Sequence, residues 1–446
     1  MATRRLLFLT LTIAMTLGTG SIAVAVDEND AWGQVPTPNA SPDQNELAGI
    51  SASSPDDIWA VGRFNSGRPP TVSGRDTLAL RWNGSAWQIT PTPNPTWPGA
   101  DLFTLEDVES LAADNAWAVG YASDFGSFKS TTLIEHWNGA SWQIARSPNP
   151  TRNGPNQLNA IDAAASNDIW AVGGTGFFPA RSLILRFNGS RWRVVANSCG
   201  VPLSGVDVVT PTEVWAVGVQ TICRFNGSSW SVVPTPPPDP GSSEMGINLF
   251  DVSGASPDAA WAVGNRAFQA GEHVSHSALI LRWDGTSWTR IIQIPGQTLF
   301  GVVALAPDDA WAVGTDGIGG VVLHWDGVDW TRVPSPPESG HIADVVPAGA
   351  KLWAAGTAQS KTLTLQSPSD LEGTVVGHTN VGFAVVSWFG PESGSTETDP
   401  FGDYTVPGLL AGNYFFTVGN PGCEPASGNV TVVAGETIRR DFTLNC

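Results

Sequence analysis

The six residues Asp57-Ile-Trp-Ala-Val-Gly62, "DIWAVG", decide the fold because the chain repeats them. Related stretches with the same central Trp and the same final Gly occur six more times, spaced 42 to 58 residues apart. They read NAWAVG at 115–120, DIWAVG at 168–173, EVWAVG at 213–218, AAWAVG at 259–264, DAWAVG at 309–314 and KLWAAG at 351–356. A period of this length is typical of proteins built from one repeated supersecondary unit.

Each copy lies inside a longer unit that reads as four short strands. An apolar run such as LAGISA (47–52) precedes it, and in six units an alternating run such as TLALRW (77–82) follows, before a last run that opens with Trp. Asn-Gly or Asp-Gly separates the last two runs in those six units, which predicts tight hairpins because these residues tolerate positive φ. Four antiparallel strands per unit predict an all-β fold, a β-propeller.

The seventh unit has only three of the four runs, because nothing after KTLTLQS (361–367) supplies a strand that opens with Trp. The missing run is DAWGQVPTPN (30–39), whose Trp32 and following prolines match the register of the run that opens with Trp87. A strand lent across the junction closes a ring without a bare edge. We therefore predict a seven-bladed β-propeller over residues 30–370, closed by its N-terminal strand.

The repeat also resembles known propeller families. The phrase DIWAVGG…LILRFNGSRW (168–192) resembles kelch propellers, whose blades carry a second strand ending in Gly and a Trp that opens the fourth. It is similar as well to Asp-box propellers of the sialidase and photosystem-assembly-factor kind. The Gly-x-x-Trp of that box is present, but its Asp is displaced, since Asn or Asp stands immediately before the Gly. The resemblance implies an architecture and no particular activity.

The repeat ends after QSPSD (366–370), and residues 371–446 read as a small all-β domain of six or seven strands. This segment resembles the carboxypeptidase-regulatory-like (prealbumin-like) β-sandwich. The motifs that carry the resemblance are Thr398-Asp399, GDY at 402–404, Gly408-Leu409 and GNY at 412–414. The resemblance implies a spacer or adhesion module, and we assign Tyr404, Phe415 and Trp388 to its core.

Residues 1–25 have the features of a signal peptide: Arg4 and Arg5, an apolar run (6–18) and the small residues AVA (23–25). The apolar run is too short for a membrane span. We therefore predict a secreted, extracellular protein with no membrane insertion. Four cysteines in an exported chain predict two disulfides, of which three pairings are possible. Local pairing of Cys199 with Cys223 and of Cys423 with Cys446 is the simplest.

The charge of the chain narrows the classes of partner. The formal net charge is −19, and it becomes −21 once Arg4 and Arg5 are removed with the signal peptide. Such a protein repels phosphate backbones, so the charge argues against nucleic acid and against anionic membranes. We interpret the charge as a means of keeping an exported protein soluble.

Eighteen of the twenty tryptophans occupy repeated positions, which predicts packing between blades rather than ligand binding. The other two are Trp388 and Trp97, which lies in the Pro-rich connection NPTWPGAD (94–101). The long, variable loops between blade strands are expected on one face of the disc, where binding residues concentrate. The candidate binding residues on these loops are Arg63, Arg68, Trp97, Asp101, Tyr121, Phe125, Arg152, Phe177 and Phe178. This composition suits a polar polymer or a peptide.

Catalytic motifs are weak. Tyr121 is the only Tyr of the ring, which argues against copper-radical oxidases of the kelch type, and no flanking pattern supports a sialidase. We interpret His273 and His276 as solvated loop residues and predict no metal and no cofactor. The sequence therefore favours a non-catalytic exported binding or scaffold protein for a carbohydrate, a cell-wall component or a protein. The alternative is a polysaccharide-active glycosidase or lyase, which would need acids and an Arg to meet, with Asp101, Asp124, Arg63 and Arg152 as candidates.

Overall fold

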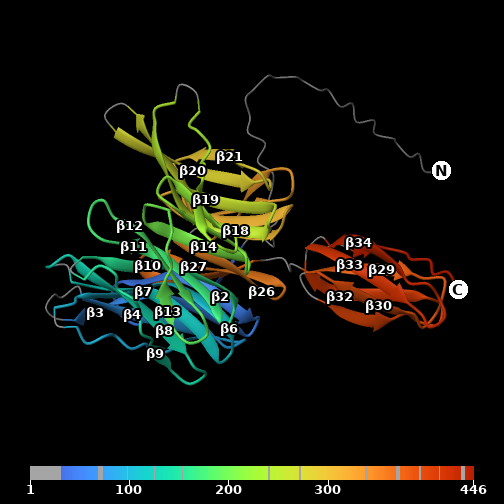
Figure 1. Ribbon diagram of the computed structural model, residues 1–446. Helices are drawn as coiled ribbons and strands as arrows, with labels where there is room; N and C mark the ends of the chain where they lie inside the picture. Colours follow the sequence, from blue (N-terminus) through green and yellow to red (C-terminus); the bar gives the residue numbers. More distant parts are fainter. Residues whose placement is uncertain are drawn as a thin grey trace, which may run out of the picture.

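The computed structural model describes residues 32–68, 74–97, 99–124, 126–152, 154–239, 242–270, 273–336, 340–367, 372–390, 393–410, 412–432 and 437–446. Within these ranges the chain forms 35 strands and no helix, as the all-β prediction requires. Figure 1 shows a large array of sheets, coloured from blue to orange, and a smaller sandwich in orange and red. No helix of the described ranges could cross a membrane. The predicted signal peptide, residues 1–25, lies outside the described residues.

The strands of the large array that the structure describes fall into seven units by their hydrogen-bonded pairing. Units 1 and 2 form one eight-stranded sheet, joined through a single parallel pair of Arg75 with Leu102. Unit 1 contains β2 (Asn45–Ser54), β3 (Asp57–Arg68), β4 (Gly74–Trp82) and β5 (Trp87–Ile89). Unit 2 contains β6 (Leu102–Ala112), β7 (Asn115–Asp124), β8 (Lys129–Trp137) and β9 (Trp142–Ile144).

The other five units are separate antiparallel four-stranded sheets among the described residues. Unit 3 contains β10 (Asn156–Ala165), β11 (Asp168–Thr175), β12 (Arg181–Phe187) and β13 (Trp192–Val194). Unit 4 contains β14 (Leu203–Thr210), β15 (Glu213–Gly218), β16 (Thr221–Phe225) and β17 (Trp230–Val233). Unit 5 contains β18 (Glu244–Ser256), β19 (Ala259–Ala270), β20 (His273–Trp283) and β21 (Trp288–Pro295). Unit 6 contains β22 (Thr298–Ala306), β23 (Asp309–Thr315), β24 (Gly320–Trp325) and β25 (Trp330–Val333). Unit 7 contains β26 (His341–Ala348), β27 (Lys351–Ala358), β28 (Lys361–Gln366) and β1 (Gly33–Val35).

Strand β1 joins residues from the two ends of the array. Gly33–Val35 pairs antiparallel with Thr364–Gln366 of β28, and the backbone N–H of Trp32 donates to the carbonyl of Pro334 at 3.1 Å. The hydroxyl groups of Thr37 and Thr362 lie 2.8 Å apart. Segments that are more than 300 residues apart in the sequence therefore share one sheet.

The predicted hairpins form as the Asn-Gly and Asp-Gly pairs indicate. In the turn between β4 and β5, the Oδ1 atom of Asn83 accepts hydrogen bonds from the N–H groups of Ser85 and Ala86 at 3.1 and 3.0 Å. Gly84 has a φ of 85°, a conformation that only glycine adopts without strain. The equivalent glycines of the next five units have φ values between 82° and 92°.

Buried apolar side chains gather between consecutive units. Seven clusters of the described residues each combine side chains of two neighbouring units, and the cluster of units 7 and 1 joins the last unit to the first. Trp59 of unit 1, for example, packs against Trp137 and Trp142 of unit 2 with ring centroids 5.0 and 4.9 Å apart. Burial of one Trp is worth up to about 4–6 kcal/mol before entropy is counted. The prediction that the repeated tryptophans are packing residues is confirmed, since nearly all of them are buried.

We call the first strand of each unit its innermost strand. The innermost strands of neighbouring units are joined by hydrogen bonds between side chains and the backbone, in place of a continuous strand ladder. One carboxylate oxygen of Asp107 on β6 accepts from the N–H of Ile161 on β10 at 2.8 Å. Asp251 bonds Val302 of the next unit in the same way at 2.9 Å, and Asp344 of unit 7 bonds Ile50 of unit 1 at 2.9 Å. The residue that faces each of these Asp residues, on the innermost strand of the preceding unit, is a glycine. At Gly49, a Cβ atom would lie 2.7 Å from the Cα atom of Asp107.

The C-terminal segment folds into two sheets around one apolar core. The three-stranded sheet contains β32 (Asp403–Leu410), β29 (Glu372–His378) and β35 (Thr437–Arg439). The four-stranded sheet contains β31 (Gly394–Glu397), β30 (Val385–Phe389), β33 (Gly412–Gly419) and β34 (Ala426–Val432). Tyr404 is buried and Trp388 packs against the core, as predicted. The assignment of Phe415 to the core is wrong: it is 45% exposed, because its neighbours Tyr414 and Phe416 alternate inward.

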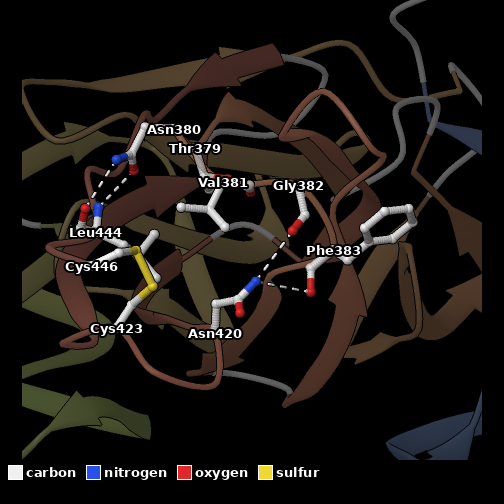
Figure 2. Close-up of a disulfide and its surroundings, with 9 residues drawn as sticks. All are labelled: Thr379, Asn380, Val381, Gly382, Phe383, Asn420, Cys423, Leu444 and Cys446. Carbon is white, nitrogen blue, oxygen red and sulfur yellow. Dashed lines mark hydrogen bonds between the residues drawn. A yellow bond between two sulfur atoms is a disulfide. The ribbon is translucent and has the colours of Figure 1, made fainter.

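Both predicted cysteine pairs form. Cys199 bonds Cys223 beside the cluster of units 3 and 4, with Cα atoms 5.9 Å apart, and Cys423 bonds Cys446 with Cα atoms 4.1 Å apart. Figure 2 shows the second disulfide beside Asn380, whose side chain donates to the carbonyl of Leu444 at 2.9 Å and accepts from its N–H at 2.8 Å. The last residues are thus held to the β33–β34 connection by the disulfide and to the loop before β30 by these hydrogen bonds.

Candidate functional site

A cavity of about 500 Å³ lies where the innermost strands of all seven units converge, and we call it the mouth cavity. Its lining comes from β2, β3, β6, β10, β14, β18, β22, β26 and β27. Most of its residues lie near the first residues of the innermost strands or, like Gly62 and Arg63, in the later part of β3. The cavity therefore opens at the end of the strands where the long β3–β4 and β7–β8 loops begin, the face predicted to carry binding residues.

One half of the mouth cavity is charged. The guanidinium of Arg63 lies 2.5 Å from a carboxylate oxygen of Glu46 and 3.7 Å from one of Glu106. Arg75 lies 3.5 Å from the other oxygen of Glu46. Thr104 donates a hydrogen bond to Glu106 at 3.0 Å. Two carboxylates and two arginines from four neighbouring strands therefore share one network.

Burial and the charges of this network shift the ionisation of Glu106 and of the neighbouring Tyr121. Burial raises the pKa of Glu106, and the charge of Glu46 adds to the rise, while Arg63 and the hydroxyl of Thr104 oppose it. The pKa of Tyr121 is raised to about 12, first by burial and then by the charge of Glu106. Tyr121 is therefore a neutral hydrogen-bonding group at pH 7, and Glu106 holds its proton to a higher pH than an exposed Glu does.

The other half of the mouth cavity is aromatic. The rings of Phe250 on β18 and Phe300 on β22 lie 5.3 Å apart, and the ring of Phe300 lies 4.2 Å from that of His341 on β26. Burial lowers the pKa of His341, so its imidazole is neutral at pH 7. Asn159 on β10 and Ser204 on β14 complete the lining between the two halves. The side chain of Asn159 is oriented by its hydrogen bond to the carbonyl of Leu203 at 2.7 Å.

A smaller cavity of about 110 Å³ continues from the mouth cavity into the ring. Its lining includes Asp107, Asp251 and Asp344, the carboxylates that bond the innermost strands together. Burial, with mutual repulsion in second place, raises the pKa of Asp107 and Asp251 well above the usual range, and burial raises that of Asp344 to about 6. We interpret these carboxylates as structural, because the oxygens of each accept two backbone N–H groups.

Among the predicted binding residues whose side chains the structure describes, two come together at the mouth cavity. Arg63 lines the mouth cavity, and Tyr121 lies close enough to Arg63 and Glu106 for their charges to affect its pKa. Asp101 is only 7% exposed, and Trp97 packs against a small cluster that contains Phe103.

The other predicted residues lie elsewhere. Arg152 is exposed, and Phe177 and Phe178 extend into solvent, Phe178 being 100% exposed. Arg68 ends β3 by pairing with Gly74, but its side chain lies outside the described residues, as does Phe125. Of the four residues considered for catalysis, only Arg63 lines the mouth cavity. His273 and His276 are exposed as expected, but they lie on strand β20 and not on a loop. No group of three or more His, Cys, Asp or Glu side chains in the described ranges could hold a metal ion.

The lining of the mouth cavity was not predicted from the sequence, because binding residues were expected on the loops. A signal was present inside the repeat, at the residue directly after the Leu or Ile of each innermost strand that pairs with the final Gly of the second-strand motif. This position reads Ala48, Glu106, Asn159, Ser204, Phe250, Phe300 and Ala343, whereas the Leu or Ile before it stays apolar in every unit. A repeat position that varies in chemistry between constant packing positions marks a lining residue, and all seven of these residues line the mouth cavity.

Comparisons with known proteins bear on the fold of the two parts of the chain. The family model of the carboxypeptidase regulatory-like domain matches residues 370–445, so the resemblance seen in the C-terminal sequence is confirmed. A comparison with curated proteins gives no match.

The ring is similar to solved β-propellers. The structure of U3-55K is 9% identical with a TM-score of 0.50, and the likeness covers 76% of this chain and 98% of that one. The WD40 repeats of RRP9 are 10% identical with a TM-score of 0.47, covering 74% and 98% of the two chains. Sqt1 of Saccharomyces cerevisiae is 10% identical with a TM-score of 0.43, with the same coverage. At these identities the likeness shows the fold alone.

Proposed function

We propose that this protein is an exported, non-catalytic binding protein whose propeller takes a segment of polysaccharide at the mouth cavity. One observation carries the proposal: the cavity opposes an aromatic arc (Phe250, Phe300 and His341) to a hydrogen-bonding network around Arg63. Sugar rings present apolar C–H faces and polar hydroxyl edges, so they need both kinds of surface. A cell-wall component would contact the same surfaces. If no glycan binds, a protein becomes the proposed partner.

The finer architecture belongs to the same proposal. The ring has seven blades of a kelch-like or Asp-box-like kind and closes through the strand within residues 30–39. Seven sheet units among the described residues, the pairing of β1 with β28 and the cluster of units 7 and 1 support it. The C-terminal domain acts as a spacer or a second, weaker contact. Two disulfides support export, since such bonds persist in oxidising compartments.

A second candidate function has a specific observation in its favour. Glu46, Glu106 and Arg63 meet at the mouth cavity, and Tyr121 lies beside them. A pair of carboxyl groups of which one has a raised pKa is the arrangement that glycosidases use for a general acid and its partner. A polysaccharide-active glycosidase or lyase is therefore the alternative, with Glu106 as the acid.

A glycan-array screen of residues 27–446 tests the proposal, with residues 27–370 and 371–446 screened in parallel. We expect residues 27–370 to bind, and Phe300→Ala to weaken that binding at least tenfold because the centre of the aromatic arc is lost. Phe178→Ala is the matched control, since that ring projects into solvent. Binding that Phe300→Ala leaves unchanged contradicts the site.

The same glycans distinguish the two candidates. A non-catalytic protein leaves a bound glycan intact for days, whereas an enzyme releases new reducing ends or unsaturated products. Release that Glu106→Gln abolishes without weakening binding would establish the alternative.

A further inference from the structure

A second cavity, of about 750 Å³, lies between units 2 and 3 and shares no lining residue with the mouth cavity. Part of its wall is formed by the segment that follows β9 and by the start of β13, which are the last strands of units 2 and 3. We therefore call it the rim pocket. Its aromatic wall is formed by Trp117, His136 and Phe187, in addition to Trp192. The imidazole of His136 stacks on Trp117 at 4.1 Å, and Phe187 lies 4.8 Å from the same indole.

The junction of units 1 and 2 shows why this pocket is open. There the guanidinium of Arg81 lies over Trp59 and Trp137, at 5.1 and 5.3 Å from the ring centroids, and donates to the carbonyl of Ala113 at 2.9 Å. Asp57 balances its charge with an N–O distance of 2.6 Å. The guanidinium of Arg81, the indole of Trp137 and the carboxylate of Asp57 together fill that junction.

All three groups are replaced at the junction of units 2 and 3. His136 stands where Arg81 does, Phe187 where Trp137 does, and Asn115 where Asp57 does, as the strand registers show. Asn115 and His136 bond each other at 3.0 Å as a neutral pair. Imidazole is shorter than an arginine side chain and phenyl is smaller than indole, so the space that the larger groups occupy elsewhere remains open.

The charge at this pocket is opposite to that of the chain. The net charge of the protein is −19, yet no Asp or Glu occurs among the residues that line the rim pocket. Arg146 and Arg191 both line it, and neither side chain is in an ion pair within the described ranges. Most other described arginines of the ring are paired with a carboxylate. Two uncompensated guanidinium groups beside neutral aromatic rings form a surface that attracts an anion.

We propose that the rim pocket binds a uronate, the carboxylate-bearing sugar of an acidic polysaccharide. Arg146 and Arg191 hold the carboxylate, because the guanidinium fork matches its two oxygens. The faces of His136 and Phe187 receive the apolar side of the sugar ring. Burial lowers the pKa of His136, so the imidazole is uncharged at pH 7 and acts as an apolar face. Ser147, Asn149 and Ser190 in the lining offer polar groups to sugar hydroxyls, which an aromatic acid of similar charge would not need.

The junction of units 6 and 7 provides an internal comparison. His324 stacks on Trp311 at 4.1 Å, as His136 stacks on Trp117, but it is bonded to the carboxylate of Asp309 at 2.9 Å. A carboxylate at this place repels a second one. A histidine in place of the arginine is therefore not sufficient for the site. The neutral Asn115 and the two arginines are also required.

Isothermal titration of residues 27–446 with oligogalacturonates tests the proposal, with maltooligosaccharides as the neutral match and benzoate as a carboxylate without a sugar. We expect oligogalacturonates to bind, more weakly at high salt, and Arg146→Ser/Arg191→Ser to reduce the affinity at least tenfold. Arg193→Ser is the matched control, because Arg193 lies on the same short strand as Trp192 but does not line the pocket.

A filling variant separates loss of the site from loss of the fold. Asn115→Asp/His136→Arg rebuilds the pair that fills the junction of units 1 and 2 and keeps the net charge. We expect it to abolish oligogalacturonate binding at an unchanged or higher Tm. The glycan array tests the mouth cavity through Phe300→Ala, whereas this titration tests the rim pocket through the filling variant, so failure of this proposal and failure of the proposed function are distinguishable. Equal binding by the wild type and the Arg146→Ser/Arg191→Ser variant, equal binding of the neutral sugars, or binding of benzoate alone would overturn it.

Discussion

The ring and the C-terminal sandwich obtain their stability in different ways. The ring has no single core: apart from a small cluster around Phe103, its described apolar side chains form seven clusters, each shared by two consecutive units. The sandwich has one cluster, enclosed by its own two sheets, and a disulfide that includes the last residue of the chain. Each unit of the ring thus shares its apolar core with its neighbours, whereas the sandwich encloses a core of its own.

Their buried polar groups differ as well. Carboxyl groups with raised pKa values line the inside of the ring, and among the described residues of the sandwich no Asp or Glu is buried. The ring tolerates its carboxylates because their oxygens accept backbone N–H groups across units, where no continuous strand ladder exists. We therefore expect a break at one junction to affect the whole ring cooperatively, and loss of the disulfide to affect the sandwich locally.

The largest effect should come from removing the strand that joins the ends of the ring. Deletion of residues 27–46 removes β1 and Trp32, which is buried against Trp311 with ring centroids 5.9 Å apart. We expect the ring to lose its cooperative unfolding transition, or to unfold more than about 10 °C lower, since the loss of one large core side chain alone costs about 3–5 kcal/mol. Calorimetry of the full chain measures this, because the sandwich transition should stay in place.

A shorter deletion, of residues 27–31, is the control, because it leaves Trp32 and β1 intact. A ring transition at the original temperature after deletion of 27–46 would contradict the closure of the ring through this strand.

Most of the fold could be predicted from the sequence because one physical requirement is repeated in every unit. A Trp in the second strand, an alternating third strand and Asn-Gly before the fourth each determine local structure, and their period determines the architecture. Both disulfides could be predicted because the paired cysteines are close in sequence, 24 and 23 residues apart. Phe415 was misplaced because three consecutive aromatics, Tyr414, Phe415 and Phe416, do not reveal which of them alternates outward.

An intermediate effect should come from the disulfide of the sandwich. Cys423→Ser/Cys446→Ser opens a link between residues 23 apart, and we expect the sandwich to lose about 3 kcal/mol of unfolding free energy through the added entropy of its unfolded state. Denaturant unfolding of the full chain, followed by near-ultraviolet circular dichroism and calorimetry, measures the change. The reciprocal control is Cys199→Ala/Cys223→Ala, which should shift the ring transition alone. If both pairs shift the same transition, the two regions do not unfold independently.

The candidate site was less predictable than the fold. Its residues come from strands that are far apart in sequence, and each looks like an ordinary strand residue in its own unit. Phe250 and Phe300 form an arc only because the ring brings β18 beside β22. Arg63 was identified because it was expected in a long loop, but its partners Glu46, opposite it on β2, and Glu106, on β6 of the next unit, were not. The rim pocket results from side chains that are smaller at the junction of units 2 and 3 than at the junction of units 1 and 2. It can therefore be recognised only by comparing the junctions.

The smallest effect should come from Glu135, the one acid among seven equivalent positions of the third strands. The others are Leu80, Leu185, Cys223, Leu281, Leu323 and Leu365. Glu135 is 0% exposed on the face of β8 that contributes Leu133 and Trp137 to the cluster of units 1 and 2. Neither of its carboxyl oxygens has a hydrogen-bond partner within the described ranges. We expect Glu135→Leu to stabilise the ring by about 2 kcal/mol at pH 8.

The pH dependence of this gain follows from the direction of the pKa shift. Burial raises the pKa of Glu135 well above its usual value of 4.5, so the folded ring binds a proton that the unfolded chain releases. The free energy of unfolding is therefore lowered as the pH rises above about 4.5, and the loss continues until the folded-state pKa is reached. The difference in Tm between Glu135→Leu and wild type should be small at pH 4 and grow towards pH 8. Glu135→Gln, which cannot ionise but keeps a buried polar group, should remove the pH dependence of the difference and recover only part of the gain. An equal Tm for all three proteins across this range would mean that the carboxyl group is hydrated inside the junction.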